Sequence, residues 1–92
     1  MPAAAEAARL RSERLRWRSR RALLELDLLL QRFWGRQAQV LDAESAAALE
    51  QLLEMEDHDL WRLLGGEQRL ANAALQHMVD RLRAPADANS ET

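Results

Sequence analysis

The chain contains no cysteine, no isoleucine and no lysine, and it has only two valines and one threonine. Because β-branched and aromatic side chains fill the faces of a sheet, their scarcity disfavours strands. Leucine and alanine, which are both good helix formers, account for 18 and 17 of the 92 residues. The composition therefore predicts an all-α protein.

The same absences exclude several kinds of chemistry. Without cysteine there are no disulfides, thiolate zinc sites or cysteine nucleophiles, and two histidines cannot build a histidine-rich metal cage. Glu54 and His58 are four residues apart, but a predicted helix break separates them and no third ligand lies at a matching spacing. No glycine-rich phosphate loop or hydrolase motif is present. We therefore expect no metal site and no catalytic residue, and interpret the chain as a binding protein rather than an enzyme.

The chain also lacks a long uninterrupted apolar run. Its most apolar stretch, residues 22–34, contains four charged or amide side chains, so we expect no membrane insertion. The first ten residues lack the apolar region of a secretory signal, which favours a cytosolic protein. A chain of 92 residues is expected to form one small domain, whose thin core cannot readily enclose a large cofactor.

All basic residues are arginine, and the charges are unevenly distributed. Residues 1–21 contain seven Arg and two Glu, a net charge of +5, whereas residues 42–61 contain seven acidic residues and no basic one. A basic start alone would favour nucleic acid or an anionic membrane surface. The whole chain is slightly acidic, however, with a net charge of −2 and a pI of about 5.7. A dipolar domain is the favoured interpretation, and a small nucleic-acid-binding or regulatory protein that uses the Arg-rich start stays an alternative.

Apolar residues spaced by three and four positions predict a chain of short helices. The expected helices cover residues 9–18, 20–34, 43–55, 58–64 and 67–83. We expect residues 1–8, which are rich in alanine, to be a flexible start, and residues 9–84 to form the helical domain. Pro85 prevents continuation of the last helix, so residues 85–92 are predicted to be a disordered tail.

Capping residues and apolar stripes define these helices further. Ser19, Asp42 and Asp57 are placed to cap the second, third and fourth helices. Gly35 and the pair Gly65-Gly66 are expected stops. The inner stripes predict a core that includes Leu23, Leu26, Leu30, Leu49, Leu53, Leu60 and Trp61.

Two arginines stand at an unusual place in this pattern. Arg20 and Arg21 open the predicted second helix, where positive charge opposes the helix dipole at a cost of about 0.3–1 kcal/mol each. One interpretation is a surface ion pair between Arg21 and Glu25, worth a few tenths of a kcal/mol. The other is a partner site, in which Arg21, Ala22 and Glu25 present a donor fork, a small flat spot and an acceptor. The residues alone leave both interpretations open.

Two separated blocks of sequence match a known family. The segments RLRWRSRRALLELDLLLQRFW and LLEMEDHDLW resemble the succinate dehydrogenase assembly factor family, which comprises bacterial FAD assembly factors and their mitochondrial relatives. The resemblance covers about residues 14–64. Its first block is an Arg-Arg-Gly step followed by Glu and Leu-Asp, and its second is Leu-Leu-Glu followed by acidic residues, Leu and an aromatic. The matching residues are Arg20, Arg21, Glu25, Leu26 and Asp27, then Leu52, Leu53, Glu54, Asp57, Asp59, Leu60 and Trp61.

One position departs from the family pattern. The family motif Arg-Gly-x-x-Glu reads Arg21-Ala22-Leu23-Leu24-Glu25 here, so alanine replaces the glycine that the family places against its client protein. The expected fold does not depend on this position. Tolerance of the extra methyl group, a shifted client and a diverged relative of the family are the three interpretations of this departure.

The resemblance implies a compact five-helix bundle that acts as an assembly chaperone. It would bind the flavoprotein subunit of succinate dehydrogenase, or of fumarate reductase, and promote covalent attachment of FAD to a client histidine. FAD would be acted on through the client and not held stably by the factor, which we expect to be a monomer when free and to bind no nucleic acid. The expected compartment is the cytoplasm of a bacterium, or the mitochondrial matrix in a eukaryote. An adaptor for another partner is a further alternative.

The resemblance also implies a client-binding surface. Its expected residues are Trp17, Arg20, Arg21, Ala22, Glu25, Asp57 and Asp59. Arg21 and Glu25 would contact the client near the flavin site. Trp17, Arg20 and the acidic step from Asp57 to Asp59 would flank or support that surface.

Overall fold

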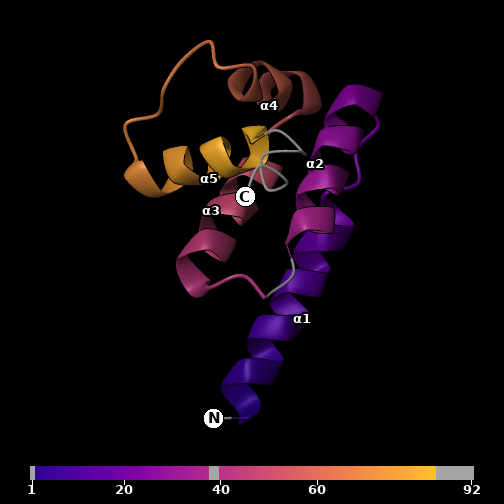
Figure 1. Ribbon diagram of the computed structural model, residues 1–92, viewed down its shortest axis with the longest axis vertical. Coiled ribbons are helices and arrows are strands. Elements are labelled where there is room, and N and C mark those ends of the chain that lie inside the picture. The colour runs from indigo at the N-terminus through magenta and orange to yellow at the C-terminus, as the bar shows by residue number, and fades with distance from the viewer. Residues whose placement is uncertain (1, 38–39, 85–92) are drawn as a thin grey trace, which may run out of the picture.

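The computed structural model describes residues 2–37 and 40–84. It contains five helices: α1 Pro2–Arg18, α2 Leu24–Arg36, α3 Ala43–Leu53, α4 Asp57–Leu64 and α5 Ala73–Arg83 (Figure 1). No strand is present in these two stretches, so the all-α prediction is confirmed. Among the described residues, no helix is long and apolar enough to cross a membrane.

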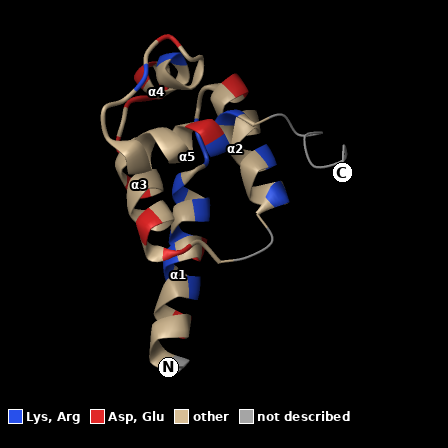
Figure 2. Ribbon diagram, turned by 60° about the vertical axis from the view of Figure 1, so that its left-hand side comes forward, with Lys and Arg blue, Asp and Glu red and all other residues tan. Residues whose placement is uncertain are grey.

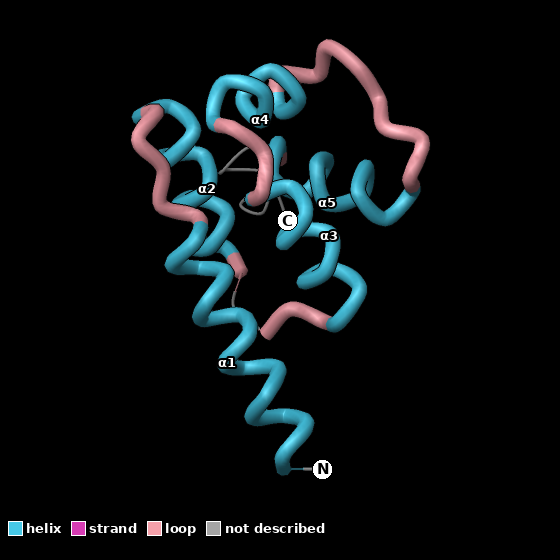
Figure 3. Tube along the Cα trace, turned by 180° about the vertical axis from the view of Figure 1, so that it is seen from behind, coloured by secondary structure: helices cyan, strands magenta, loops and turns pink. Residues whose placement is uncertain are grey.

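The helices pack around α5. This helix contacts α2, α3 and α4, while α1 packs on α3. Helices α1 and α2 run in opposite directions along one side of the molecule, and the first turns of α1 extend beyond the other helices (Figures 1 and 3). The arrangement places the α1–α2 connection next to the start of α4, at the end of the molecule opposite the N-terminus.

The core consists mainly of leucine from all five helices. Side chains that are at most 1% exposed include Leu15, Leu26, Leu30, Leu49, Leu60, Met78 and Leu82. The predicted burial of Leu53 is also confirmed, whereas Leu23 is only partly buried. The prediction for Trp61 is wrong, because this side chain is 37% exposed. Leu63 and Leu64, three and four residues after Leu60, fill the inward side of α4 and leave Trp61 at its rim.

Four of the five helices begin at residues other than the predicted ones, and the starts of α1 and α5 differ most. Helix α1 starts at Pro2 instead of residue 9, so the Ala-rich residues 3–8 belong to it. Alanine has the highest helix propensity, and Arg9 pairs with both Glu6 and Glu13 one turn away on either side. Helix α5 starts at Ala73 instead of residue 67, because the Asn72 side chain accepts the backbone N–H of Leu75. The predicted tail, residues 85–92, lies outside the described residues.

The predicted caps and stops are partly correct. Asp42 occupies the cap position of α3, but its side chain makes no capping hydrogen bond. A hydrogen bond from the Ser45 side chain is the main cause of its lowered pKa. Gly65 ends α4 as predicted, and Gly66 follows with a positive φ of 86°. In contrast, α2 continues through Gly35 to Arg36.

The start of α4 is shifted by one residue from the prediction. Glu56, rather than Asp57, caps this helix, and its carboxylate accepts the N–H groups of His58 and Asp59. The pKa of Glu56 is lowered, mainly by a hydrogen bond with the His58 side chain. Asp57 thereby becomes the first residue of α4, which leaves its carboxylate available to other partners.

Two leucines in α2 provide a test of this packing. Leu30 is fully buried and Leu28, in the same helix, is 55% exposed. We expect Leu30→Ala to lower the free energy of unfolding by about 2–5 kcal/mol, since it leaves a cavity in the core. Leu28→Ala is the matched control, with an expected change within about 0.5 kcal/mol. Urea denaturation measures both values, and equal losses would contradict the described core.

Candidate functional site

The segment between α1 and α2, residues 19–23, contains the central part of the predicted site. Ser19 begins it and is fully buried rather than capping a helix from the surface. Its Oγ donates to the carbonyl oxygen of Leu15 at 2.7 Å and accepts the Trp34 indole N–H at 2.9 Å. Ser19 therefore lies directly after the last residue of α1 and connects the segment to α2 through its hydrogen bond with Trp34.

Asp27 holds the segment from the first turn of α2. Its Oδ1 accepts the backbone N–H of Arg21 at 2.7 Å and the Nε–H of Arg20 at 3.1 Å. These hydrogen bonds lower the pKa of Asp27, the one from the Arg21 backbone most and the one from the Arg20 side chain next. The sequence identified Asp27 as a family match but did not indicate this role.

Asp57 holds the same segment from the start of α4. One carboxylate oxygen accepts the backbone N–H of Leu23 at 3.1 Å, and the other accepts Arg21 Nη1 at 3.3 Å. The second terminal nitrogen of Arg21 donates to the carbonyl oxygen of Leu53, at the end of α3. The Arg21 side chain is only 15% exposed, so its guanidinium points into the protein.

Asp27 and Asp57 therefore act in the same way, and we call them the aspartate clamp. Each accepts one backbone N–H and one guanidinium group of residues 20–23. The surface ion pair between Arg21 and Glu25, one of the two interpretations that the residues left open, does not form, because Arg21 pairs with Asp57 instead. By reaching the α3–α4 corner, Arg21 gains a carboxylate and a carbonyl partner, which a surface pair would not provide. The helix-dipole argument does not apply either, because α2 starts at Leu24, after both arginines.

Several predicted site residues remain exposed around the clamp. Ala22 and Glu25 are exposed, the Arg20 side chain is 64% exposed, and Trp17 is 79% exposed. Leu24, which was not predicted as a site residue, is a large exposed apolar residue between Ala22 and Glu25. These five exposed residues follow one another along the chain from the end of α1 to the first turn of α2. We call them the motif surface.

The position of Ala22 differs from the helical one predicted. It lies in a bend before α2, and no residue other than glycine has a positive φ in the described part of the chain. The backbone at this position therefore does not require glycine. Asp59, predicted to support the site, lies on α4 and pairs with Arg62 at 2.6 Å. It belongs to the surface of α4 and not to the clamp.

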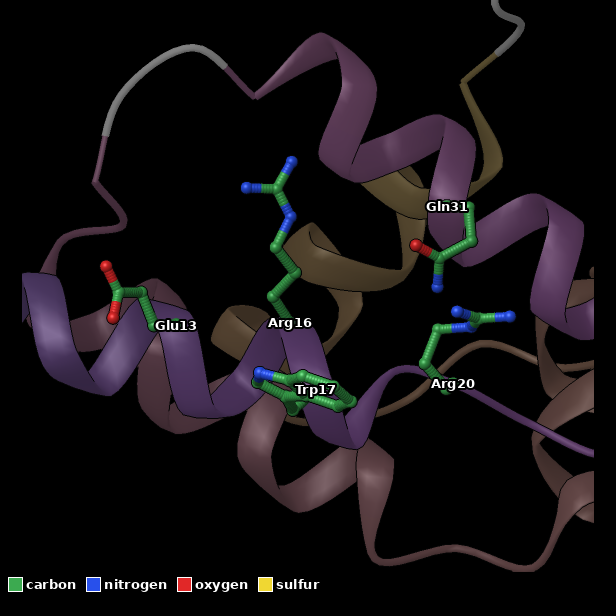
Figure 4. A pocket seen from close by; sticks show the side chains of 5 residues that line it. All are labelled: Glu13, Arg16, Trp17, Arg20 and Gln31. Carbon is green, nitrogen blue, oxygen red and sulfur yellow. The ribbon is translucent and has the colours of Figure 1, made fainter.

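An open hollow of about 360 Å³ adjoins the motif surface, between α1 and α2. Figure 4 shows Arg16 rising from α1 and Gln31 reaching from α2 into this space, with Arg20 at one end. No group of three or more potential metal ligands occurs within residues 2–37 and 40–84. The arrangement offers hydrogen-bond donors, one carboxylate and apolar surface, which suit contact with another protein.

A comparison with known families agrees with this geometry. The model of the family described as "Flavinator of succinate dehydrogenase" matches residues 13–86, which include the clamp and the motif surface. The chain belongs to this family. The resemblance inferred from the sequence is therefore confirmed.

Several relatives of this flavinator-family protein are named FAD assembly factor SdhE. The one from Ralstonia nicotianae is 40% identical over 78 residues, which cover 80% of this chain and 82% of that protein. The one from Pseudomonas aeruginosa is 45% identical over 69 residues, which cover 73% of this chain and 80% of that protein. The one from Methylococcus capsulatus is 39% identical over 71 residues, which cover 77% of this chain and 86% of that protein. No solved structure matches the chain.

Asp27 makes the stability of the flavinator-family protein depend on pH. The folded-state pKa of Asp27 lies below its ordinary value, so its stabilising effect is complete above the unfolded pKa of about 4. This effect is lost as the pH falls through the folded pKa. We expect Asp27→Asn to lower the free energy of unfolding by about 1–2 kcal/mol at pH 7, and by progressively less below about pH 4.

Asp59→Asn is the matched control for this prediction. Among the described residues, the Asp59 carboxylate pairs with Arg62 in an exposed position, so we expect its loss to change stability by under about 1 kcal/mol. Denaturation of both variants between pH 3 and pH 7 provides the measurement. A difference for Asp27→Asn that does not vary with pH would show that the ionised carboxylate is not what holds the segment.

Proposed function

We propose that this protein is an assembly factor that binds the flavoprotein subunit of succinate dehydrogenase and promotes covalent attachment of FAD to it. We refer to this subunit as the client, and a fumarate reductase flavoprotein is an alternative client. The main observation is the aspartate clamp, which presents the family motif residues as one ordered surface. The family description and the names of the relatives support the assignment.

In this proposal the site residues have two different roles. Trp17, Arg20, Ala22 and Glu25 contact the client, because they are exposed on the motif surface. Arg20 uses Nε and Nη2 toward Asp27, which orients the guanidinium while Nη1 stays available to a client acceptor. Arg21 and Asp57 support the surface from inside, and Asp59 contacts the client at its edge.

The proposed mechanism depends on preorganisation. A segment that is already fixed loses little conformational entropy on binding, so more of the contact energy contributes to affinity. Binding would select the client conformation in which the flavin and its acceptor histidine are close. The bond forms between the client and FAD, which is the cargo, so the factor itself supplies no catalytic residue and holds no cofactor stably. We place this activity in the cytoplasm, with the free factor a monomer.

The charge pattern supports a protein partner over nucleic acid. Glu50 of α3 pairs with Arg11 at 3.2 Å and with Arg18 at 3.6 Å, and Glu6 and Glu13 pair with Arg9. Figure 2 shows basic residues mainly on α1 and α2, with acidic residues on α3, which packs against α1 (Figure 2). Much of the positive charge of α1 is therefore balanced within the domain, and we propose that it binds no nucleic acid.

Glu25 provides a direct test of the proposed client surface. It is exposed and makes no ion pair within the described residues, so Glu25→Ala should change the free energy of unfolding by under about 1 kcal/mol. We expect the affinity for the purified client, measured by calorimetry, to fall at least tenfold. Glu67→Ala removes the same charge from an exposed position outside this surface, and should leave the affinity within about twofold. An unchanged affinity for Glu25→Ala would contradict the proposed surface.

Ala22 tests how closely the client approaches. Glycine here would lower the melting temperature, because it increases the entropy of the unfolded chain by an equivalent of about 0.4–1 kcal/mol. We expect Ala22→Gly to tighten client binding despite this loss, since removing the methyl group allows closer backbone contact. Ala22→Arg should weaken binding with little effect on melting, because the position is exposed. Thermal melting and calorimetry measure both properties. If neither variant alters client affinity, Ala22 is not at the interface.

A further inference from the structure

The hollow beside the motif surface continues along α1 and α2. A second hollow of about 170 Å³ adjoins it, and the two share Glu13 and Arg16 in their linings. The second one extends past Trp34 toward Val40. Together they form an open furrow, which we call the α1–α2 furrow. Its other end lies at Trp17 and Arg20, within the motif surface.

Arg16 stands at the middle of this furrow. Its guanidinium carbon lies 5.6 Å from the centre of the Trp34 ring. No carboxylate or carbonyl group of the described residues binds it, whereas Arg9, Arg11 and Arg18 of the same helix all pair with glutamates. The planar guanidinium is therefore oriented by an aromatic ring and free to bind a carboxylate through two parallel hydrogen bonds.

Trp17 adds apolar surface next to this charge. Its side chain is 79% exposed, the highest value among the large apolar residues. Tryptophan and arginine are both enriched among the residues that contribute most of the binding energy at protein interfaces. Glu13 is the acidic residue in the lining, and it already pairs with Arg9 at 2.8 Å. The furrow therefore offers an unpaired positive charge and a bare aromatic surface together.

We propose that the α1–α2 furrow binds an acidic segment of the client flavoprotein, with a carboxylate on Arg16 and an apolar side chain against Trp17. This inference rests on the proposed function, since it names the client chemistry recognised beside the motif surface. Two features favour this occupant. The charge of the furrow is complementary to aspartate or glutamate. The furrow also shares Trp17 and Arg20 with the motif surface, so a client segment bound at these two residues lies at its end.

Charge reversal at Arg16 provides the main test. We expect Arg16→Glu to weaken binding to the purified client at least tenfold in calorimetry. Arg69→Glu is the matched control, because it makes the same change in net charge at an exposed loop position outside the furrow. Its affinity should stay within about twofold of the unsubstituted protein. Arg16→Gln, which is close in size and uncharged, replaces Arg16→Glu in the comparison if circular dichroism shows that the reversal disturbs folding.

A photocrosslinker identifies the occupant. Benzoylphenylalanine at position 17, an exposed site, would be irradiated in the complex with the client, and the crosslinked peptide sequenced by mass spectrometry. A client peptide that contains Asp or Glu within a few residues of the crosslink supports the inference. A client peptide without acidic residues overturns it, and so does a crosslink to residues 85–92 of this chain, which contain Asp87 and Glu91.

The outcomes separate this inference from the proposed function. If the unsubstituted protein does not bind the client, both are overturned. If it binds the client and Glu25→Ala weakens binding, but Arg16→Glu and Arg69→Glu behave alike, only the furrow is overturned. Tenfold weakening that is confined to the Arg16 variants supports the acidic segment.

Discussion

The backbone N–H groups of Arg21 and Leu23 lie in a bend outside the helices, and both need hydrogen-bond acceptors. Asp27 and Asp57 supply them, from the first turns of α2 and α4. Each aspartate also binds a guanidinium group of the same short segment. This pair of side chains therefore connects the segment that follows α1 to both α2 and α4. The exposure of Ala22 and Glu25 depends on this arrangement, because a looser segment would not keep them on one surface.

The clamp also separates two arginines that are adjacent in sequence. Arg20 remains largely exposed while it is oriented by Asp27, whereas Arg21 is directed inward to Asp57 and to the end of α3. A substitution of Arg21 would therefore act first on the structure of the motif surface, and only through it on a partner. This difference matters when the family motif is interpreted, because equal loss of function at two motif positions can have different physical causes.

Much of the fold follows from simple features of the sequence. The lack of β-branched residues and the leucine spacing predict an all-α domain, and the burial of Leu26, Leu30 and Leu49 follows from the same stripes. The sequence could not show where α2 begins, because none of the residues before it is a helix-breaking type. One of the two aspartates that bind this segment, Asp57, also lies 36 positions after Arg21. The spacing of four residues suggested an ion pair between Arg21 and Glu25, but the Arg21 side chain binds Asp57 and the carbonyl oxygen of Leu53 instead. Trp61 was predicted to be buried, but Leu63 and Leu64 already fill the core side of α4 and leave it exposed.

We infer that this ordered motif surface promotes the attachment of FAD to a flavoprotein. The most direct test combines the purified client subunit with FAD, with and without this protein, and measures covalent flavin by its fluorescence in a denaturing gel. We expect a clear increase in client fluorescence with the protein, and little increase with a variant in which both Asp27 and Asp57 are replaced by Asn. Equal covalent flavin in the presence and absence of the protein would rule out this function.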